Sequence, residues 1–577
     1  MIWQFKEKAH KLLAEETGTV VKDWGGRLRI ALVFPNTYYV GMSNLGFQTI
    51  YWTLNRRPEI VCERAFLPED DDLREHERLR VPILSLESQR SLADFDCVAF
   101  STTYENDYLN MLRILELCGI PVQARERGPG HPLVTMGGVC AWSNPEPLTP
   151  FVDWFFLGEG EESSHEAFEL WRQVVQAERD PAAARTEFLR AICRIEGIYV
   201  PRLYDVTYQE DGTVAEVTAR EGAPLPARKR RLAQTDAYDT VSMVRTANTE
   251  FGEMALLEVG KGCGRGCRFC MEGEIYRPVR HRHIDAILRA AETALQHGKR
   301  IGLVGACVSD YPWIDELVSA LRARGVDFSL SSVRADSLTR GLVQGLLESG
   351  TRTLTIAPEA GTERLRTVIH KSLSDRRLFE AVDLIAESGV PSVKLYFMIG
   401  QPTETTEDVE GIIHLAKTAR HRILQKRKDR TRTVEITVGV SSFVPKPWTA
   451  FQWCAMADVR TLDEKIQHLR RELVRVGIHF THDVPKWAYL QGVLSRGDRQ
   501  VGDLLHLALR HAGDWKRAFR DWSRNPDFYA CRERPLRERF PWDHIEVGTK
   551  RERLETEYQR AMGLLPERSV QWKASLA

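Results

Sequence analysis

Short apolar runs alternate with longer amphipathic segments along most of the chain. The first series comprises the runs at 29–35, 95–102, 132–138 and 153–162. Short buried strands that alternate with helices are typical of a doubly wound parallel sheet, which binds ligands at the carboxyl ends of its strands. We therefore predict a Rossmann-like α/β domain over residues 29–195, preceded by an amino-terminal helix within residues 1–28.

A second series of apolar runs follows a segment of different character. Residues 196–245 alternate around an Asp-Gly pair and then become rich in Arg and Pro, which predicts a hairpin and a linker. The second series comprises the runs at 254–262, 300–306, 327–334, 353–360, 392–400 and 434–443. Six β/α units predict a partial (β/α)6 TIM-type barrel over residues 246–454. Beyond that point we expect no further strands, and we predict a helical carboxyl-terminal domain over residues 455–577.

The overall charge and hydropathy exclude some classes of protein. The 80 Lys and Arg residues balance 80 Asp and Glu residues, so no net field attracts the whole chain to nucleic acid or to an anionic membrane. The basic run at residues 420–432 is interpreted as a solvated helix face rather than a phosphate site. No apolar run is long enough to cross a membrane and the start of the chain is charged. We expect a cytoplasmic protein whose thiols stay reduced.

Three of the eleven cysteines are clustered, and the other eight are scattered along the chain. Cys263, Cys267 and Cys270 form a C-x3-C-x2-C pattern on a glycine-rich segment directly after the first predicted barrel strand. Thiolates in a reducing compartment bind zinc or iron–sulfur clusters. Structural zinc requires four protein ligands, and no further Cys or His stands nearby to complete such a set. A cubane cluster held by three cysteines leaves one iron open, whereas a zinc knuckle or a chance cluster is the alternative.

The pattern C-x3-C-x-aromatic-C, placed after the first strand of a six-unit barrel, resembles the radical S-adenosylmethionine (radical SAM) superfamily. The resemblance implies a 4Fe-4S cluster on the three cysteines, with the amino and carboxylate groups of S-adenosylmethionine on the open iron. The contacts with S-adenosylmethionine that it implies are Phe269, Gly305, Ser331, Ser332, Arg334, Glu359 and Gly400. The segment GLVGACVSD lacks the Glu that the family usually has after the second strand, so Gly305 offers only backbone groups.

The end of the first predicted strand resembles a cobalamin-binding Rossmann domain. Such domains often carry D-x-H-x-x-G, with His as the lower cobalt ligand, and this chain has Asn36, Tyr38 and Gly41 in that frame. A phenol is a poor cobalt ligand compared with imidazole, so cobalamin would be bound without a protein ligand on its lower face. The further cobalamin contacts that the resemblance implies are Ser101, Thr103, Gly137 and Gly138. A Rossmann-like scaffold that has lost its ligand is the alternative.

The chain as a whole is similar to a largely uncharacterised family of cobalamin-domain radical SAM proteins, through segments such as VGMSNLGFQTIYWTLN, FVPKPWTAFQW and PWDHIEVG. The resemblance implies an enzyme that cleaves S-adenosylmethionine reductively to a 5′-deoxyadenosyl radical and methylates an unactivated carbon. It also implies an electron donor such as flavodoxin or ferredoxin and no membrane partner. The substrate stays open between a small molecule, RNA and protein. Cyclisation or rearrangement without methylation, or a non-catalytic cobalamin or redox sensor, are the alternatives.

Overall fold

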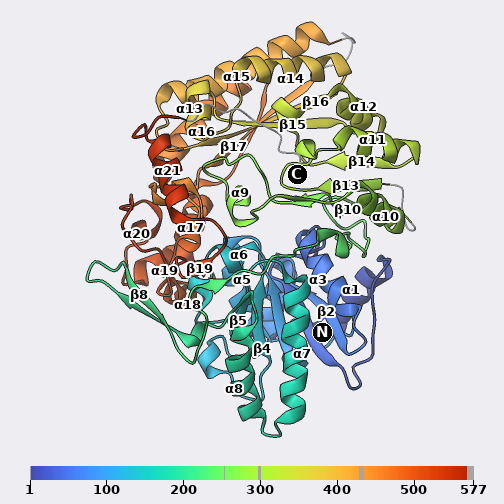
Figure 1. Cartoon of the computed structure of the whole chain (residues 1–577), viewed down its shortest axis with the longest axis vertical. Helices are drawn as coiled ribbons and strands as arrows, with labels where there is room; N and C mark the ends of the chain where they lie inside the picture. The colour runs from blue at the N-terminus through green and yellow to red at the C-terminus, as the bar shows by residue number, and fades with distance from the viewer. Residues whose placement is uncertain (1, 253, 296–299, 428–433, 568–577) are drawn as a thin grey trace.

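The computed structural model describes residues 2–252, 254–295, 300–427 and 434–567. Two α/β units are stacked on each other, and the carboxyl-terminal helices run along one side of both units (Figure 1). The first unit lies at the bottom of Figure 1 and the second at the top, with the red carboxyl-terminal segment at the left. None of the helices in the described ranges is long and apolar enough to span a membrane.

The first unit is a six-stranded sheet in the order β2-β1-β3-β4-β5-β6. Its strands are β1 (Leu28–Phe34), β2 (Ile60–Phe66), β3 (Cys97–Ser101), β4 (Leu133–Gly137), β5 (Trp154–Phe156) and β6 (Ile198–Tyr199). The first five strands are parallel, and only β6 runs antiparallel to its neighbour. Its helices are α1 (Ile2–Ala14), α2 (Tyr38–Met42), α3 (Leu45–Asn55), α4 (Asp70–Leu79), α5 (Tyr108–Leu117), α6 (Val139–Ser143), α7 (Gly160–Ala177) and α8 (Pro181–Ala191). The strand order reverses between β1 and β3, which is where doubly wound sheets bind ligands.

An antiparallel hairpin connects the two units, as the sequence predicts. It is formed by β7 (Tyr204–Tyr208) and β8 (Val214–Ala219) around Gly212, whose φ of 84° suits a glycine turn. After the hairpin, β9 (Ala227–Arg228) pairs in parallel with β19 (Ile545–Glu546). The connector is therefore held by a strand from the far end of the chain.

The second unit consists of two parallel sheets that continue each other. The first contains β10 (Ala255–Glu258), β13 (Arg300–Val304) and β14 (Asp327–Leu330); the second contains β15 (Thr353–Glu359), β16 (Ser392–Ile399), β17 (Glu435–Ser442) and β18 (His479–His482). A parallel bridge between Val333 and Ile356 joins them. The covering helices are α10 (Ile284–Leu295), α11 (Ile314–Ala323), α12 (Arg340–Glu348), α13 (Glu363–Val368), α14 (Asp375–Ser388), α15 (Thr406–Lys426) and α16 (Val459–Val474). Alternate residues of β16 are buried against these helices, so the intervening side chains face the other side of the sheet.

The expectation that strands stop near residue 455 is wrong. β18 follows α16 and pairs in parallel with β17, from Thr437 with His479 to Val440 with His482. Its four residues are partly or fully exposed and include two histidines, so no apolar run marks it in the sequence. The strand is defined by its backbone pairing with β17 rather than by burial of its side chains.

The carboxyl-terminal helices are α17 (Pro485–Ser495), α18 (Val501–Arg510), α19 (Trp515–Asp521), α20 (Asp527–Ala530) and α21 (Arg551–Ala561). Two of them, α17 and α18, pack against the first unit, whereas the last helix, α21, packs against α13 of the second unit. Leu490, Val493 and Leu504 belong to the same buried cluster as the strands of the first sheet. The carboxyl-terminal region and the first unit therefore share one hydrophobic core.

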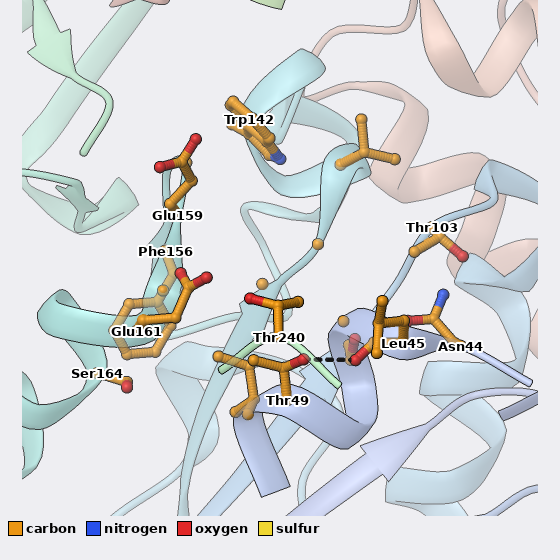
Figure 2. A pocket seen from close by; sticks show the side chains of 18 of the residues that line it. Asn44, Leu45, Thr49, Thr103, Trp142, Phe156, Glu159, Glu161, Ser164 and Thr240 are labelled. Atoms are coloured by element: carbon orange, nitrogen blue, oxygen red, sulfur yellow. Dashed lines mark hydrogen bonds between the residues drawn. The ribbon is translucent and has the colours of Figure 1, made fainter. Parts of the chain in front are cut away.

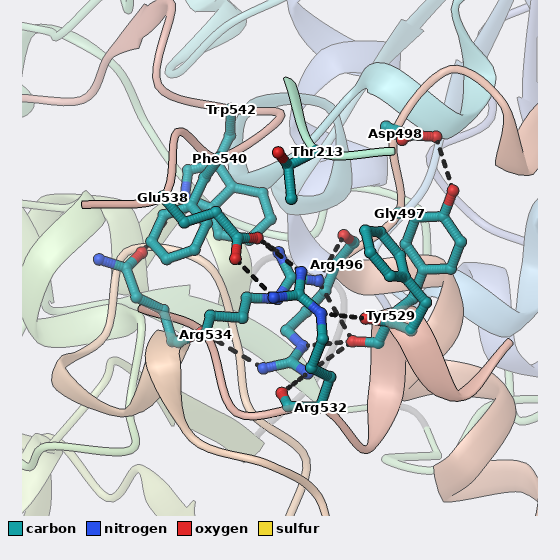
Figure 3. A network of polar contacts seen from close by, with 12 residues as sticks. Thr213, Arg496, Gly497, Asp498, Tyr529, Arg532, Arg534, Glu538, Phe540 and Trp542 are labelled. Carbon is teal, nitrogen blue, oxygen red and sulfur yellow. Dashed lines mark hydrogen bonds and ion pairs between the residues drawn. The ribbon is translucent and has the colours of Figure 1, made fainter. Parts of the chain in front are cut away.

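A buried arginine ties these helices to the end of the barrel (Figure 3). The Arg496 guanidinium is fully buried and donates to the carbonyls of Tyr529 at 2.9 Å, Cys454 at 2.7 Å and Ala530 at 2.9 Å. The neighbouring Arg534 stacks over Phe540, with 5.5 Å between the guanidinium carbon and the ring centroid. Burial lowers the pKa of Arg496, and the nearby Arg534 lowers it further. Because its contacts are backbone carbonyls, this side chain holds the end of α20 against the segment at Cys454.

Candidate functional site

A cavity of about 510 Å³ lies between the carboxyl ends of the two sets of strands. It extends from Leu32, Ala99 and Phe168 inside the first unit to Lys261 and Gly305 in the second unit. Figure 2 shows Thr103, after β3, on one side of this space and Glu159 and Glu161, at the start of α7, on the other. Parallel sheets bind ligands at the carboxyl ends of their strands, and these ends face the same cavity in both units.

Four of the predicted cobalamin contacts line this cavity. Ser101 ends β3 and Thr103 follows it, whereas Gly137 ends β4 and Gly138 directly precedes α6. Gly138 has a φ of 92°, and a Cβ atom there would stand 2.4 Å from the carbonyl oxygen of Thr102. The loops after β3 and β4 can pack together only because this residue has no side chain.

The other three predicted cobalamin contacts are not among the residues that line the cavity. The amide of Asn36 donates to Asp107 at 2.9 Å, and the hydroxyl of Tyr38 donates to Glu16 at 2.6 Å. A Cβ atom on Gly41 would stand 2.5 Å from the ring of Phe66. Burial raises the pKa of Tyr38, and the Glu16 carboxylate raises it further, so the phenol is a hydrogen-bond donor and not a phenolate ligand. Asn36 and Tyr38 have hydrogen-bond partners within the first unit, and the predicted contact of these three residues with cobalamin stays a prediction.

The cysteine segment is a loop closed at its base by two short strands. β11 (Gly260–Lys261) pairs in antiparallel fashion with β12 (Arg280–His281), and the loop between them includes the short helix α9 (Glu272–Ile275). Gly262 has a φ of 82°, and a Cβ atom there would stand 2.8 Å from the carbonyl oxygen of Tyr276. Gly266 also has a positive φ, of 69°. The glycines therefore permit the tight path that the sequence predicts.

The three cysteines of this loop are partly exposed and lie near one another. Burial raises the pKa of Cys270 to about 12, and the charges of Cys267 and Cys263 add to the shift. In the described part of the chain, no three Cys, His, Asp or Glu side chains converge closely enough to hold a single metal ion. A cubane binds each cysteine through a different iron, so its ligands stand farther apart than those of one zinc ion. Three neighbouring thiols without a fourth protein ligand therefore fit a cluster better than structural zinc.

An arginine between two of the cysteines anchors the loop. The Arg268 side chain is 1% exposed and pairs with Glu557 at 3.0 Å and Glu567 at 2.7 Å, both from the carboxyl-terminal region. It also donates to the carbonyl of Val368 at 2.9 Å, while its own amide donates to the carbonyl of Ile369 at 3.0 Å. The ends of α13 and α21 thus hold the loop from two sides. Sequence reasoning missed this contact because its acidic partners, Glu557 and Glu567, are 289 and 299 residues away.

Two family profiles match the two units. "Radical SAM proteins, N-terminal" covers residues 46–201, and "Radical SAM superfamily" covers residues 257–416. The uncharacterized protein MJ0966 of Methanocaldococcus jannaschii is 31% identical over 482 residues, which are 82% of this chain and 90% of that protein. The chain belongs to this family of radical SAM proteins. The membership implies that this radical SAM enzyme uses a 4Fe-4S cluster, S-adenosylmethionine and an electron donor.

Two further similarities are more distant. The ribosomal protein uS12 methylthiotransferase RimO of Thermotoga petrophila is 25% identical over 238 residues, which are 38% of this chain and 55% of RimO. The cobalamin-dependent S-adenosylmethionine radical enzyme OxsB, solved with aqua-cobalamin and S-adenosylmethionine, is 13% identical, with a TM-score of 0.46. That similarity covers 85% of this chain and 71% of OxsB.

Most of the predicted S-adenosylmethionine contacts stand at or just after the carboxyl ends of strands in the second unit, whereas Phe269 lies in the cysteine loop. Gly305 follows β13 and lines the cavity, whereas Ser331 and Ser332 are exposed at the end of β14. Phe269 packs on the aliphatic and aromatic cluster that contains Phe451. Gly400 follows β16, and its amide donates to Glu404 at 2.9 Å.

Arg334 and Glu359 have charged partners within the protein. Burial lowers the pKa of Arg334, but its hydrogen bonds to Asp336, at 2.9 and 3.1 Å, outweigh burial and raise the pKa. Negative charge on Cys267 and Cys307 raises the pKa of Arg334 further. The Glu359 carboxylate accepts from Lys371 at 3.1 Å, and its φ of 68° marks a break in the register of β15. Arg334 therefore stands beside the cysteine loop, and Glu359 ends the next strand.

Sequence reasoning missed a set of ionisable residues on the cavity wall. Lys261 stands 3.3 Å from both Glu161 and Glu258, and the Glu carboxylates outweigh burial and raise its pKa. Burial raises the pKa of Glu272 to about 7, with Glu258 adding to the shift. The edge of Tyr276 meets Trp142 with ring centroids 4.7 Å apart, and both rings line the cavity. The only signal in the sequence is that Lys261 and Glu272 flank the cysteine triplet.

The basic run at 420–432 is described only in part, because residues 428–432 lie outside the described ranges. Within α15, Arg422 pairs with Asp383 at 2.6 Å and stacks over Phe379. The charge of Arg422 is therefore neutralised by a carboxylate of the same chain and is not available for a phosphate, which agrees with the interpretation of this run as a helix face.

Proposed function

We propose that this protein is a cobalamin-dependent radical SAM enzyme that methylates an unactivated carbon of its substrate. The cluster and S-adenosylmethionine supply a 5′-deoxyadenosyl radical, and bound cobalamin supplies the methyl group. Hydrogen abstraction and methyl transfer have to occur in one space, so the proposal requires both cofactor sites to open into the same cavity.

The observation that carries the proposal is the cavity between the two units. Its wall contains the ends of β3 and β4 from the first sheet and Gly305 and Lys261 from the barrel. Lys261 immediately precedes the glycine that starts the cysteine loop, so the loop begins at the edge of the cavity. A nucleotide tail entering between β1 and β3 would bring the attached ring system to that edge.

The deep part of the cavity also fits an organic ligand. It is lined by apolar side chains such as Leu32, Ala99 and Phe168, together with a few polar groups. The hydroxyl oxygen of Ser164 is buried there and has no hydrogen-bond partner within the described part of the chain. A buried hydroxyl without a partner costs stability, and a ligand atom in the cavity would restore the lost hydrogen bond.

The residues of this chain have distinct tasks in the proposed site. Lys261, fixed between Glu161 and Glu258, keeps a positive charge at the boundary between the units. Trp142 and Tyr276 close the wall and exclude water, which protects a reactive radical from side reactions. None of the described residues that line the cavity is a histidine, so the residues after β3 and β4 would hold bound cobalamin without an imidazole ligand.

Reconstitution tests the proposal. The full chain would be supplied with iron, sulfide, cobalamin and a low-potential reductant, and S-adenosylmethionine labelled in its methyl group would be added. We expect formation of 5′-deoxyadenosine, loss of that product in the Cys263→Ala variant, and cobalamin that stays bound through gel filtration. Absence of 5′-deoxyadenosine, or equal yields from the wild type and Cys263→Ala, would contradict the proposal. Once a substrate is known, label in its product separates methylation from cyclisation or rearrangement.

A further inference from the structure

A second cavity, of about 490 Å³, lies beside the first between the two units. One wall is formed by the loop after β3 together with α5, and the opposite wall by the turn after β18 together with α17 and the start of α19. Thr103 lines the first cavity and the next residue, Tyr104, lines the second. The loop after β3 therefore contributes to the walls of both cavities.

Aromatic rings are left exposed on the walls of this second cavity. Trp487 is 42% exposed and Tyr104 is 40% exposed, and Trp515 lines the same space. The ammonium group of Lys486 stands 5.0 Å from the centroid of the Trp487 ring. Exposed indole and phenol faces around a concave space provide stacking platforms for a planar ligand.

Amide groups accompany these rings. The Asn106 amide nitrogen donates to the Tyr104 hydroxyl at 2.8 Å and to the Trp487 carbonyl at 3.2 Å. Its side-chain oxygen is buried without a hydrogen-bond partner among the described residues. Gln491 and Asn110 also line the space. Side-chain amides both donate and accept, which suits the edge of a nucleobase.

The elements around the cavity carry exposed cations without an ion-pair partner among the described residues, and the carboxylate of Asp483, which accepts hydrogen bonds from Ser442, also lines the cavity. Lys486 adjoins Trp487, and Lys516 and Arg517 follow Trp515; these three side chains are exposed, and none of them has an ion pair with an acidic side chain in the described ranges. Exposed cations without acidic partners, placed beside aromatic stacking surfaces, are suited to bind a polyanion that carries planar rings.

We propose that the second cavity binds an unpaired nucleobase of RNA, with the adjoining phosphates held by the lysine and arginine side chains of α19 and the start of α17. The inference specifies the substrate class of the proposed enzyme, since the cavity adjoins the proposed methylation site. RNA binding itself does not depend on radical chemistry, so the two proposals fail separately.

The test measures binding of a fluorescein-labelled, unstructured 12-nucleotide RNA of mixed sequence to the cluster-loaded full chain by fluorescence anisotropy. Trp487→Ala removes one stacking face, and we expect it to weaken binding by about tenfold. Trp3→Ala is the matched control, because Trp3 is 69% exposed and lies on α1, and it should bind like the wild type. Equal affinities of Trp487→Ala and the wild type would overturn the proposal.

A charge-reversal pair tests the phosphate contacts. The Lys516→Glu, Arg517→Glu double variant should weaken binding by about tenfold and reduce its salt dependence. Arg376→Glu with Arg377→Glu is the control, since these exposed neighbours on α14 are 73% and 60% exposed, and its affinity should not change. Equal losses in the two double variants would overturn the assignment to α19. Displacement of the RNA by AMP at concentrations similar to that of the RNA would overturn RNA in favour of a free nucleotide.

Discussion

The anchoring of the cysteine loop by Arg268 makes a quantitative prediction. Replacing Arg268 with Met removes ion pairs of 3.0 Å to Glu557 and 2.7 Å to Glu567, together with a 2.9 Å hydrogen bond to the carbonyl of Val368. Removing one partner of a buried ion pair costs about 3–5 kcal/mol, because the other charge stays buried and unpaired. Glu567 is 35% exposed and can turn to solvent, so we take the lower end, about 3 kcal/mol.

We expect this loss of free energy to destabilise mainly the cysteine loop, which Arg268 holds in place. Because each 1.4 kcal/mol is a factor of ten, the equilibrium between the ordered and the open loop shifts by about 100-fold toward the open form. We expect Arg268→Met to bind clearly less iron per chain after reconstitution and to lose free energy of unfolding in urea. Arg268→Lys keeps the charge but not the forked donor geometry, so it should lie between Met and the wild type.

The matched control for this experiment is Glu567→Gln, which removes only the more exposed carboxylate and should cost less than 1 kcal/mol. The reasoning is refuted if Arg268→Met keeps the iron content of the wild type and its free energy of unfolding within about 0.5 kcal/mol. A loss of stability with full retention of iron would show that the arginine supports the fold but does not position the loop.

Three further predictions concern the frame of the site. Burial raises the pKa of Asp107 from 3.8 to about 7, so its stabilising contribution is complete below about pH 4 and is lost as the pH rises through 7. Asp107→Asn should therefore gain stability relative to the wild type between pH 5 and pH 8, by about 4 kcal/mol at most; a constant difference across that range would contradict this. Arg496→Met leaves several buried carbonyls without a donor and should lower the free energy of unfolding by about 3 kcal/mol, more than Arg532→Met, whose side chain is 28% exposed; equal losses would count against it. Gly138→Ala puts a Cβ atom against the Thr102 carbonyl and should weaken cobalamin retention by at least about tenfold, and unchanged retention would show that the loop after β4 does not form the binding wall.

Strands could be predicted from the sequence where their own residues form an apolar run. The apolar runs that became β1, β3 and β4 are buried on both faces of a parallel sheet, so their composition alone predicts them. β18 has the sequence HFTH and is only partly buried, so its existence depends on pairing with β17, which local periodicity does not report. The same reason explains why the strands were expected to stop too early.

The candidate site divides in a similar way. The cysteine triplet and the glycines after β4 were predicted because their spacing is local and has a direct physical cause. Asn36 and Tyr38 matched a sequence frame, but Asp107 and Glu16 bind their side chains inside the first unit. Those partners are distant in the sequence, and so are the carboxylates that hold Arg268. A pattern in one segment predicts which residue types are present, whereas the fold decides which partners they find.

The central claim is that the cluster on Cys263, Cys267 and Cys270 keeps one iron open to S-adenosylmethionine. Electron paramagnetic resonance of the reduced, reconstituted full chain, recorded with and without S-adenosylmethionine, tests this claim most directly. We predict the signal of a reduced 4Fe-4S cluster whose g values shift when S-adenosylmethionine is added, because the ligand binds to the open iron. A spectrum that does not change on addition, or a protein that binds zinc and no iron, would contradict the account.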